Sequence, residues 1–209
     1  MIVLKGVCKS FGREEVLRSV SARFETGLIH GLVGRNGSGK TVLLKCIAGL
    51  TRADAGVVKV DGKRVGVEIE MPPRMGAIIE TPGFLPNYSG YRNLKFLADI
   101  RRAVGREEIC AAMERVGLDP GSRKWVSRYS LGMRQRLGIA QAIMEDPDLL
   151  ILDEPMNGLD NDGVRQMRAL FRRLQKEGRT ILLASHNPLD IDRLCDTVSE
   201  MDKGKLVAL

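Results

Sequence analysis

The sequence is poor in aromatic residues, which make up 4% of its 209 residues and include a single tryptophan. Proteins that bind single-stranded nucleic acid stack the bases on aromatic side chains and follow the backbone with a basic groove. The net charge of +7 at pH 7 would suit such a partner, but acidic residues are interspersed with the basic ones along most of the chain. We therefore expect no direct contact with nucleic acid.

Cysteine is scarce and scattered, since the four cysteines Cys8, Cys46, Cys110 and Cys195 form no C-x-x-C pair. This spacing gives no zinc signature, and buried, reduced thiols suit a protein of the cytosol. No apolar run reaches the ~18 residues that a membrane span needs. The first fifteen residues also lack the apolar segment of a signal peptide. We expect a cytoplasmic location.

Apolar runs and helical periodicity alternate along much of the chain, which is typical of an α/β protein. Nearly continuous apolar runs, each typical of a strand buried on both faces, occupy residues 27–34, 148–155 and 179–186. Helical spacing predicts helices at residues 39–50, 163–178 and 188–195. Buried strands that alternate with helices predict a mixed, mainly parallel core sheet covered on both sides.

Two further regions are expected to be added to this core. Residues 1–7 and 16–25 alternate between apolar and polar, with residues 8–15 as the connecting turn, and 56–65 reads as a hairpin around Asp61-Gly62. These segments predict an N-terminal antiparallel β subdomain. Residues 86–146 have helical spacing and predict an inserted α-helical subdomain. A last hairpin is expected at 196–209.

The segment "GRNGSGKT" satisfies the pattern G-x-x-x-x-G-K-[ST] between a predicted strand and a predicted helix. Its glycines let successive backbone N–H groups point at phosphate oxygens. Lys40 is expected to reach the β- and γ-phosphates, and the Thr41 hydroxyl to bind Mg²⁺. The predicted nucleotide-binding residues are Gly34, Arg35, Asn36, Gly37, Ser38, Gly39, Lys40 and Thr41.

A second acidic motif, "LLILDEP", ends a predicted buried strand. Asp153 is placed at the carboxyl end of this strand, where ligands bind in doubly wound sheets, and is expected to hold Mg²⁺ through a water molecule. Glu154 is expected to accept a proton from an attacking water. Together with the phosphate loop, this pair predicts hydrolysis of a nucleoside triphosphate. His30, in contrast, lies inside a buried strand and is expected to be a hydrogen-bonded core residue.

The segment "YSLGMRQRLGIAQAI", residues 129–143, resembles the signature motif of ATP-binding-cassette (ABC) ATPases. "NGLD" at 157–160 resembles the D-loop of this family, and the histidine of "ASH", His186, resembles its switch histidine. Phe11 lies where the family places an aromatic residue that stacks on adenine. The resemblance runs from Lys5 to about Leu206 and implies a P-loop ATPase fold, with residues 1–209 as one nucleotide-binding domain.

The resemblance implies that two cassettes close head to tail over ATP, each signature helix covering the partner's γ-phosphate. Ser130 and Gly132 match the signature and are expected to contact ATP bound to the partner, whereas Leu131 and Met133 depart from the family pattern. These departures put the rate of hydrolysis in question. Because one chain carries every motif, a homodimer is the simpler expectation.

The strand ending in "AIIE" places Glu80 where the family usually has a glutamine that touches Mg²⁺ and the attacking water. A carboxylate is also a suitable ligand for Mg²⁺. Together with "SLGMRQRLGIA", this glutamate resembles the ATPase subunits of bacitracin-resistance and lantibiotic-immunity exporters. That resemblance implies a separate integral-membrane permease and a peripheral location on the inner face of the membrane. The alternative is an ABC ATPase that acts on ribosomes or DNA without transport.

Overall fold

A computed structural model describes the whole chain, residues 1–209. The strands are β1 (Ile2–Phe11), β2 (Glu14–Phe24), β3 (Ile29–Val33), β4 (Ala55–Val60), β5 (Lys63–Arg64), β6 (Met75–Ile78), β7 (Leu149–Asp153), β8 (Thr180–Ala184), β9 (Thr197–Asp202) and β10 (Lys205–Ala208). The helices are α1 (Lys40–Ala48), α2 (Gly90–Arg101), α3 (Arg106–Arg115), the 3₁₀ helix η1 (Val126–Arg128), α4 (Leu131–Ile143), α5 (Asn161–Lys176) and α6 (Pro188–Leu194).

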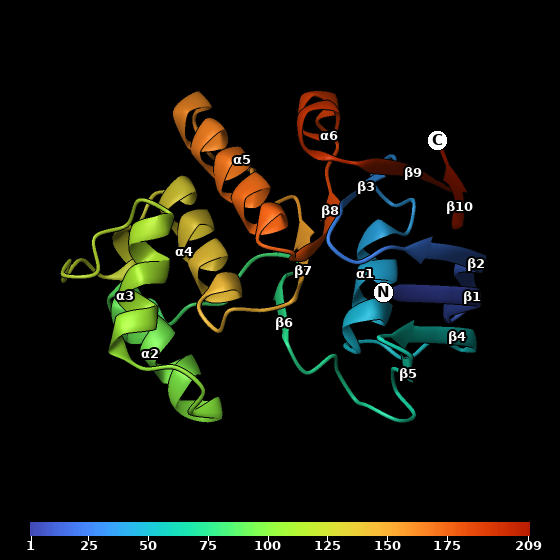
Figure 1. Cartoon of the computed structure of the whole chain (residues 1–209), viewed down its shortest axis with the longest axis horizontal. Coiled ribbons are helices and arrows are strands. Elements are labelled where there is room, and N and C mark those ends of the chain that lie inside the picture. Colours follow the sequence, from blue (N-terminus) through green and yellow to red (C-terminus); the bar gives the residue numbers. More distant parts are fainter.

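The strands form two sheets, as the apolar pattern predicts (Figure 1). The main sheet has the order β10-β9-β3-β8-β7-β6, in which every neighbouring pair is parallel except β10 and β9. The second sheet is antiparallel, with the order β2-β1-β4-β5. The expected α/β class with an antiparallel β addition is confirmed.

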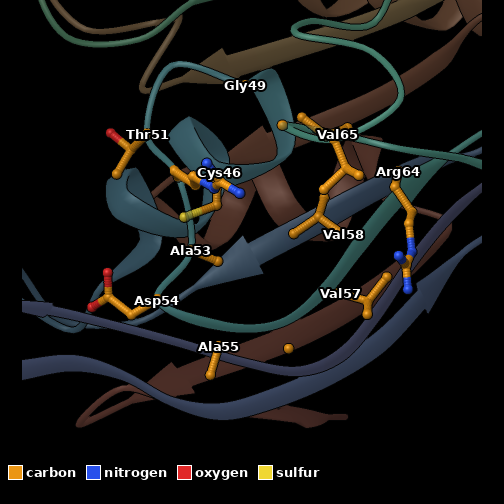
Figure 2. Close-up of a pocket in the computed structure, with 14 residues that line it drawn as sticks. Cys46, Gly49, Thr51, Ala53, Asp54, Ala55, Val57, Val58, Arg64 and Val65 are labelled. Carbon is orange, nitrogen blue, oxygen red and sulfur yellow. The ribbon is translucent and has the colours of Figure 1, made fainter.

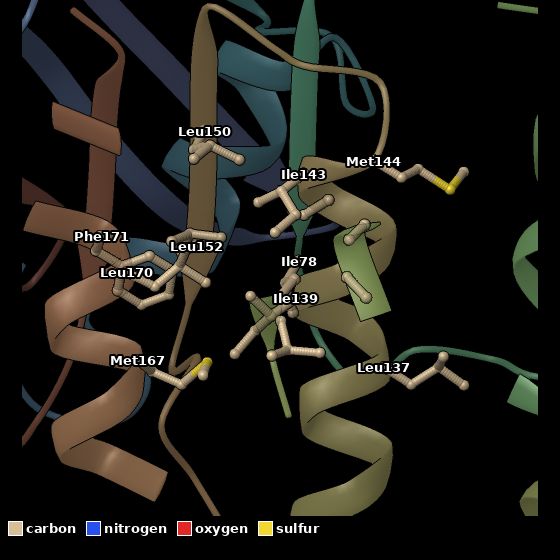
Figure 3. Close-up of a cluster of buried hydrophobic side chains, with 14 of the residues drawn as sticks. Ile78, Leu137, Ile139, Ile143, Met144, Leu150, Leu152, Met167, Leu170 and Phe171 are labelled. Atoms are coloured by element: carbon tan, nitrogen blue, oxygen red, sulfur yellow. The ribbon is translucent and has the colours of Figure 1, made fainter. Parts of the chain in front are cut away.

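The main sheet separates two hydrophobic cores, and the side chains of β7 alternate between them. Leu150 and Leu152 belong to the core formed with helices α2 to α5 (Figure 3). Leu149 and Ile151 belong to the core formed with α1 and the antiparallel sheet. Because side chains in a strand alternate between faces, burial of both faces requires the continuous apolar run seen in the sequence.

The segment between β6 and β7 is helical, as its spacing predicts. Helices α2, α3 and α4 lie together at one end of the molecule, on the left in Figure 1, with the antiparallel sheet at the other end. Ser89 and Ser130 begin α2 and α4 by accepting hydrogen bonds from the backbone N–H groups of Arg92 and Met133. None of the helices combines the length and the apolar character needed to cross a membrane.

The structure corrects two sequence-based expectations, the turn at residues 8–15 and the burial of all four cysteines. Residues 8–15 are not one connecting turn, because β1 continues to Phe11 and β2 begins at Glu14, which leaves only a two-residue turn. The expected C-terminal hairpin is present as β9 and β10, and it extends the main sheet, since β9 pairs in parallel with β3. All four cysteines are free, but only Cys46 is buried.

His30 is a buried core residue, as expected from its position in an apolar strand. Its Nε2 lies 2.8 Å from the Glu25 carbonyl oxygen and its Nδ1 lies 2.7 Å from the Thr197 hydroxyl. Because a carbonyl only accepts, Nε2 donates; in the neutral ring, which burial favours, Nδ1 then accepts from the Thr197 hydroxyl. Burial lowers the pKa of His30, and the hydrogen bond to Glu25 offsets only part of that effect.

This lowered pKa predicts a loss of stability at mildly acidic pH. Below an unfolded-state pKa of about 6.5, the unfolded chain binds a proton that the folded chain resists, so the free energy of unfolding falls as pH falls. Urea unfolding between pH 7.5 and 5.5 should show this slope, at most about 1.4 kcal/mol per pH unit. The slope should disappear in His30→Gln and persist in His186→Ala. An unchanged slope in His30→Gln would contradict the assignment.

Candidate functional site

The phosphate loop, residues 34–41, connects β3 to α1 and depends on glycine at several positions. Gly34, Gly37 and Gly39 have φ values of 146°, 79° and 108°, which L-residues with side chains rarely adopt. A Cβ atom at Gly34 would lie 2.3 Å from the carbonyl oxygen of Met201 in β9. The loop therefore needs glycine both for its backbone conformation and for its close approach to the neighbouring strand.

Two polar side chains of the loop are arranged for an anionic ligand. The buried Lys40 ammonium donates to the carbonyls of Gly34 at 2.7 Å and Arg35 at 3.1 Å, so the lysine folds back across its own loop. The Ser38 hydroxyl is buried and has no hydrogen-bond partner within the protein. A buried hydroxyl without a partner costs free energy, which a phosphate oxygen accepting from it would recover.

The first turn of α1 meets the end of β7. The Thr41 hydroxyl donates a 2.6 Å hydrogen bond to Oδ2 of Asp153. Both oxygens therefore lie at the carboxyl edge of the parallel strands, beside the phosphate loop, where ligands bind in sheets of this kind. These two residues were singled out from separate motifs, and the structure brings them into direct contact.

Glu154 and His186 also meet, although 32 positions of sequence numbering separate them. Asp153 is paired with Ala184 in the parallel β7–β8 ladder, so the residues that follow each strand emerge side by side. Nδ1 of His186 lies 2.8 Å from Oε1 of Glu154. Glu154 has a left-handed φ of 49°. Such a backbone conformation is uncommon outside glycine and is often found at functional sites.

Helix α4 holds the segment that contains Glu154, a role that the motifs did not reveal. The side-chain amide of Gln135 donates to the carbonyl oxygens of Glu154 at 3.3 Å and of Pro155 at 2.9 Å. Leu131 packs over Gly158, where an added Cβ would lie 2.5 Å from the leucine Cγ. Leu131, which departs from the family signature, is thus accommodated by the glycine of the D-loop segment.

Glu80 lies at the same site but has an unexpected partner. It follows β6 with a left-handed φ of 64°, and its Oε1 lies 2.6 Å from the ammonium of Lys45. Lys45 is four residues after Thr41 in α1, hence on the same helix face. The charge of this carboxylate is therefore partly neutralised by a lysine that motif analysis did not single out.

Phe11, Ser130 and Gly132 were predicted to contact ATP but do not line the cavity beside the phosphate loop. Phe11 ends β1, is 52% exposed, and lies under the ammonium of Lys9 at 5.2 Å from the ring centroid. The cavity beside the phosphate loop is lined instead by Glu14 and Val16 of β2. Ser130 and Gly132 lie at the start of α4, where Ser130 caps the helix and neither lines this cavity.

Some of the site residues line an open cavity of about 720 Å³, large enough for a nucleotide, whereas His186 does not line it and only contacts Glu154 in its wall. Its wall is formed by Asn36 to Thr41, Glu80, Leu131, Gln135, Asp153, Glu154 and Asn157, together with a few neighbours. A second cavity of about 280 Å³ lies at the opposite end of α1 and is shown in Figure 2. Burial raises the pKa of its only thiol, Cys46, to about 11, which keeps this thiol protonated at neutral pH.

The structure contains no group of three or more histidine, cysteine, aspartate and glutamate side chains arranged to hold a metal ion. The hydroxyl of Thr41 and the carboxylate of Asp153 are nevertheless hard oxygen donors in contact. That donor set fits Mg²⁺, which typically takes one or two protein ligands and completes its shell with phosphate oxygens and water.

The two loop glycines make a matched pair for mutation. Gly37→Ala meets no atom within 4 Å and should cost only the left-handed backbone penalty, about 1–2 kcal/mol. Gly34→Ala should cost about 1–3 kcal/mol more, because its Cβ meets the Met201 backbone, which cannot move aside as a side chain can. Urea unfolding without nucleotide measures both, and equal costs would contradict the close packing of the loop on β9.

Comparisons with known proteins identify the family of this chain. A family model described as "ABC transporter" matches residues 17–157. The bacitracin transport ATP-binding protein BcrA of Enterococcus faecalis is 42% identical over 209 residues, covering 99% of this chain and 68% of that protein. The lantibiotic transport ATP-binding protein SrtF of Streptococcus pyogenes is 33% identical over 207 residues, covering 99% of this chain and 89% of that protein.

The fold is also shared with a solved structure. The dimeric structure of MJ0796, a bacterial ABC transporter cassette, superposes with a TM-score of 0.89 at 21% sequence identity, covering 99% of this chain and 96% of that one. The family model matches most of the chain, and the two relatives are more than 30% identical along nearly all of it, which shows the family. The chain belongs to the ABC transporter family, as an ATP-binding cassette with ATPase activity.

Proposed function

We propose that this cassette hydrolyses ATP to drive export of antimicrobial peptides or similar compounds, which gives resistance or immunity. The observation that carries the proposal is that Thr41, Asp153 and Glu154 line one nucleotide-sized cavity, in which Thr41 contacts Asp153 and Glu154 is held by His186. Similarity to BcrA and SrtF supports the class of transported compound. Since the relatives described above carry transporter names, they favour transport over action on ribosomes or DNA.

In this proposal the phosphates of ATP lie in the loop of residues 34–41. Lys40 neutralises charge on the β- and γ-phosphates, and the Ser38 hydroxyl gains the acceptor that it lacks within the protein. Phe11 stacks on the adenine once its exposed side chain has turned from Lys9 toward the cavity. Arg35 and Asn36 contribute backbone contacts. The loop amides then stabilise charge that develops on the phosphate oxygens during hydrolysis.

The carboxylate of Glu154 orients and polarises a water molecule for in-line attack on the γ-phosphate. His186 contacts this carboxylate in the structure and is proposed to bridge it to the γ-phosphate. Thr41 and Asp153 are the proposed holders of Mg²⁺, with Glu80 as a further oxygen ligand after leaving Lys45. When bound, Mg²⁺ supplies positive charge that lowers repulsion between the phosphates and the nucleophile.

Two copies of the chain are proposed to close head to tail over ATP. Ser130 and Gly132 then approach the nucleotide of the partner copy, at the N-terminus of α4, where backbone N–H groups and the helix dipole favour an anion. Leu131, the first residue of α4, is 64% exposed in the single chain, so this end of the helix is accessible to a second copy. The dimeric cassette structure with the same fold supports this arrangement.

We propose that residues 1–209 form one nucleotide-binding domain that couples to a separately encoded membrane permease. The contact would be made by the loop of residues 80–91 and by the helical subdomain, residues 86–146. An exposed aromatic surface supports this location. Tyr88 and Phe96 contact edge to face at 5.0 Å, and Trp125 is half exposed, with the guanidinium of Arg128 5.9 Å from its ring. Exposed aromatic and arginine side chains are enriched at protein interfaces. The cassette would then lie on the cytoplasmic face of the membrane.

The role of Glu154 predicts a separation of binding from turnover. Glu154→Gln should keep ATP affinity within about twofold and lower kcat by at least about 100-fold, because the amide no longer accepts the proton of the attacking water. ATP binding is measured by fluorescence titration and turnover by phosphate release. Gln135→Leu serves as a milder comparison that keeps the carboxylate. Near-normal hydrolysis in Glu154→Gln would contradict the proposal.

The partner is tested by capture from the native host. The Glu154→Gln protein with ATP, extracted in mild detergent, should co-purify with an integral-membrane protein of several spans, identified by mass spectrometry. Replacing Tyr88 and Trp125 by alanine should abolish this capture, whereas Val67→Ala, at an exposed apolar site on the antiparallel sheet side, should not. Recovery of ribosomal proteins or DNA instead would contradict the transport function and leave the ATPase assignment intact.

A further inference from the structure

The mechanism above does not use Asp190, although this carboxylate is among the most buried charged groups of the chain. It lies in α6 and is 2% exposed. Removing an ionised carboxylate from water costs several kcal/mol unless it is paired and hydrogen-bonded. Such a cost in a helix that follows His186 by two residues needs a structural reason, which the contacts of the carboxylate supply.

Each oxygen of Asp190 has a different partner. Nε of Arg168 in α5 donates to Oδ1 at 2.9 Å, and Nη2 of the same guanidinium contacts Oδ1 as well. Oδ2 accepts a longer hydrogen bond, 3.4 Å, from the hydroxyl of the buried Ser185. Arg168 is itself 14% exposed in its side chain, so the ion pair is shielded from solvent. Asp190 therefore connects α5 to the residue immediately before His186.

The residue immediately after His186 is tied to the same hydroxyl. The backbone N–H of Asn187 donates to Oγ of Ser185 at 3.1 Å, and the Asn187 side chain accepts from the N–H of Leu189 to begin α6. Ser185 and Asn187 thus form a small hydrogen-bonded turn with His186 between them. The imidazole is 60% exposed, yet its Nδ1 lies 2.8 Å from Glu154.

A purely structural role for the Arg168–Asp190 pair is the simplest alternative, since it joins α5 to α6. A second pair, one helical turn later in α5, already joins this helix to the end of α6 and to Asp196, which lies between α6 and β9. Nη1 of Arg172 donates to Asp196 at 2.8 Å, and Nη2 donates to the carbonyl of Arg193. The two pairs differ in their further contacts, because Asp196 accepts from the backbone of Ile29, whereas Asp190 contacts Ser185. This difference makes Arg172 a matched control.

We propose that Asp190, oriented by Arg168, is a positioning residue that holds the Ser185–Asn187 turn and thereby aims His186 at Glu154. The inference rests on the proposed role of His186 in ATP hydrolysis. The guanidinium fixes one oxygen of the carboxylate, and the other oxygen orients the Ser185 hydroxyl, whose lone pair receives the Asn187 N–H. A displacement of His186 by about 1 Å would be enough to lower turnover by up to about 100-fold.

The first test compares three variants with the Arg172→Met control in full-length protein. Asp190→Asn and Arg168→Met should lower kcat by about tenfold or more while ATP affinity stays within about twofold. Ser185→Ala, which removes one hydroxyl, should lower kcat by about threefold or more. Arg172→Met should reduce thermal stability and leave kcat within about twofold of the unmodified protein. Equal kcat values for Arg168→Met and Arg172→Met would overturn the proposal.

The second test measures the NMR signal of the His186 imidazole in the absence of ATP hydrolysis. The chain has two histidines, His30 and His186, so ¹³C-labelled imidazoles give two ring signals that one His186→Ala spectrum assigns. In nucleotide-free protein the His186 signal should shift or broaden in Asp190→Asn and in Ser185→Ala, with the His30 signal unchanged. In Arg172→Met the His186 signal should stay in place, whereas the His30 signal, which is close to Asp196, is not part of this control. An unmoved His186 signal in Ser185→Ala would overturn the proposal. If Asp190→Asn does not fold, the Ser185→Ala spectrum alone decides the test.

The outcome is separable from the proposed function itself. Normal hydrolysis by Glu154→Gln would mean that the proposed chemistry is wrong, whatever the Asp190 variants do. An inactive Glu154→Gln together with wild-type turnover in Asp190→Asn and Ser185→Ala would leave the chemistry in place and overturn only the positioning role.

Discussion

Burial of the central strands on both faces is the constraint on which the site depends. β7 and β8 each send alternate side chains into two separate cores, so a slip of one residue would exchange the contents of both. The register that pairs Asp153 with Ala184 is therefore firmly determined. As a result, both strands reach the cavity at the same level, and Glu154 and His186 follow them into contact.

The phosphate loop is also constrained by the packing of the central strands. β3 ends beside β8 and β9, and the chain must turn at once into α1, which it does through glycines with positive φ. Close packing of Gly34 on Met201 fixes the loop against β9, and Lys40 binds the loop carbonyls from inside. The nucleotide site is thus largely formed before a ligand arrives, which lowers the ordering cost of binding.

Charges around the site are balanced by residues outside the motifs. Glu80 adds a carboxylate next to the phosphate loop, and Lys45 neutralises part of its charge from one turn beyond Thr41. The Asp190 carboxylate behind His186 is paired with Arg168 in the same way. On the other side, Gln135 binds the backbone around Glu154 through neutral hydrogen bonds. The segment that contains Glu154 is therefore held by α4, while the Ser185–Asn187 turn is held by α5 and α6.

The sequence by itself determined the fold class, the phosphate loop, the acid-tipped strand and the order of the family motifs. These are local signals, because glycine spacing, apolar runs and helix caps depend on neighbouring residues. Only the tertiary structure decided that the C-terminal hairpin joins the main sheet, that Glu80 meets Lys45, and that Asp190 contacts both Arg168 and Ser185. The position of Phe11 relative to the family motifs could be read from the sequence, but its exposure to solvent could not. Such contacts depend on strand order and on which helix faces pack together, and no local pattern of residues carries that information.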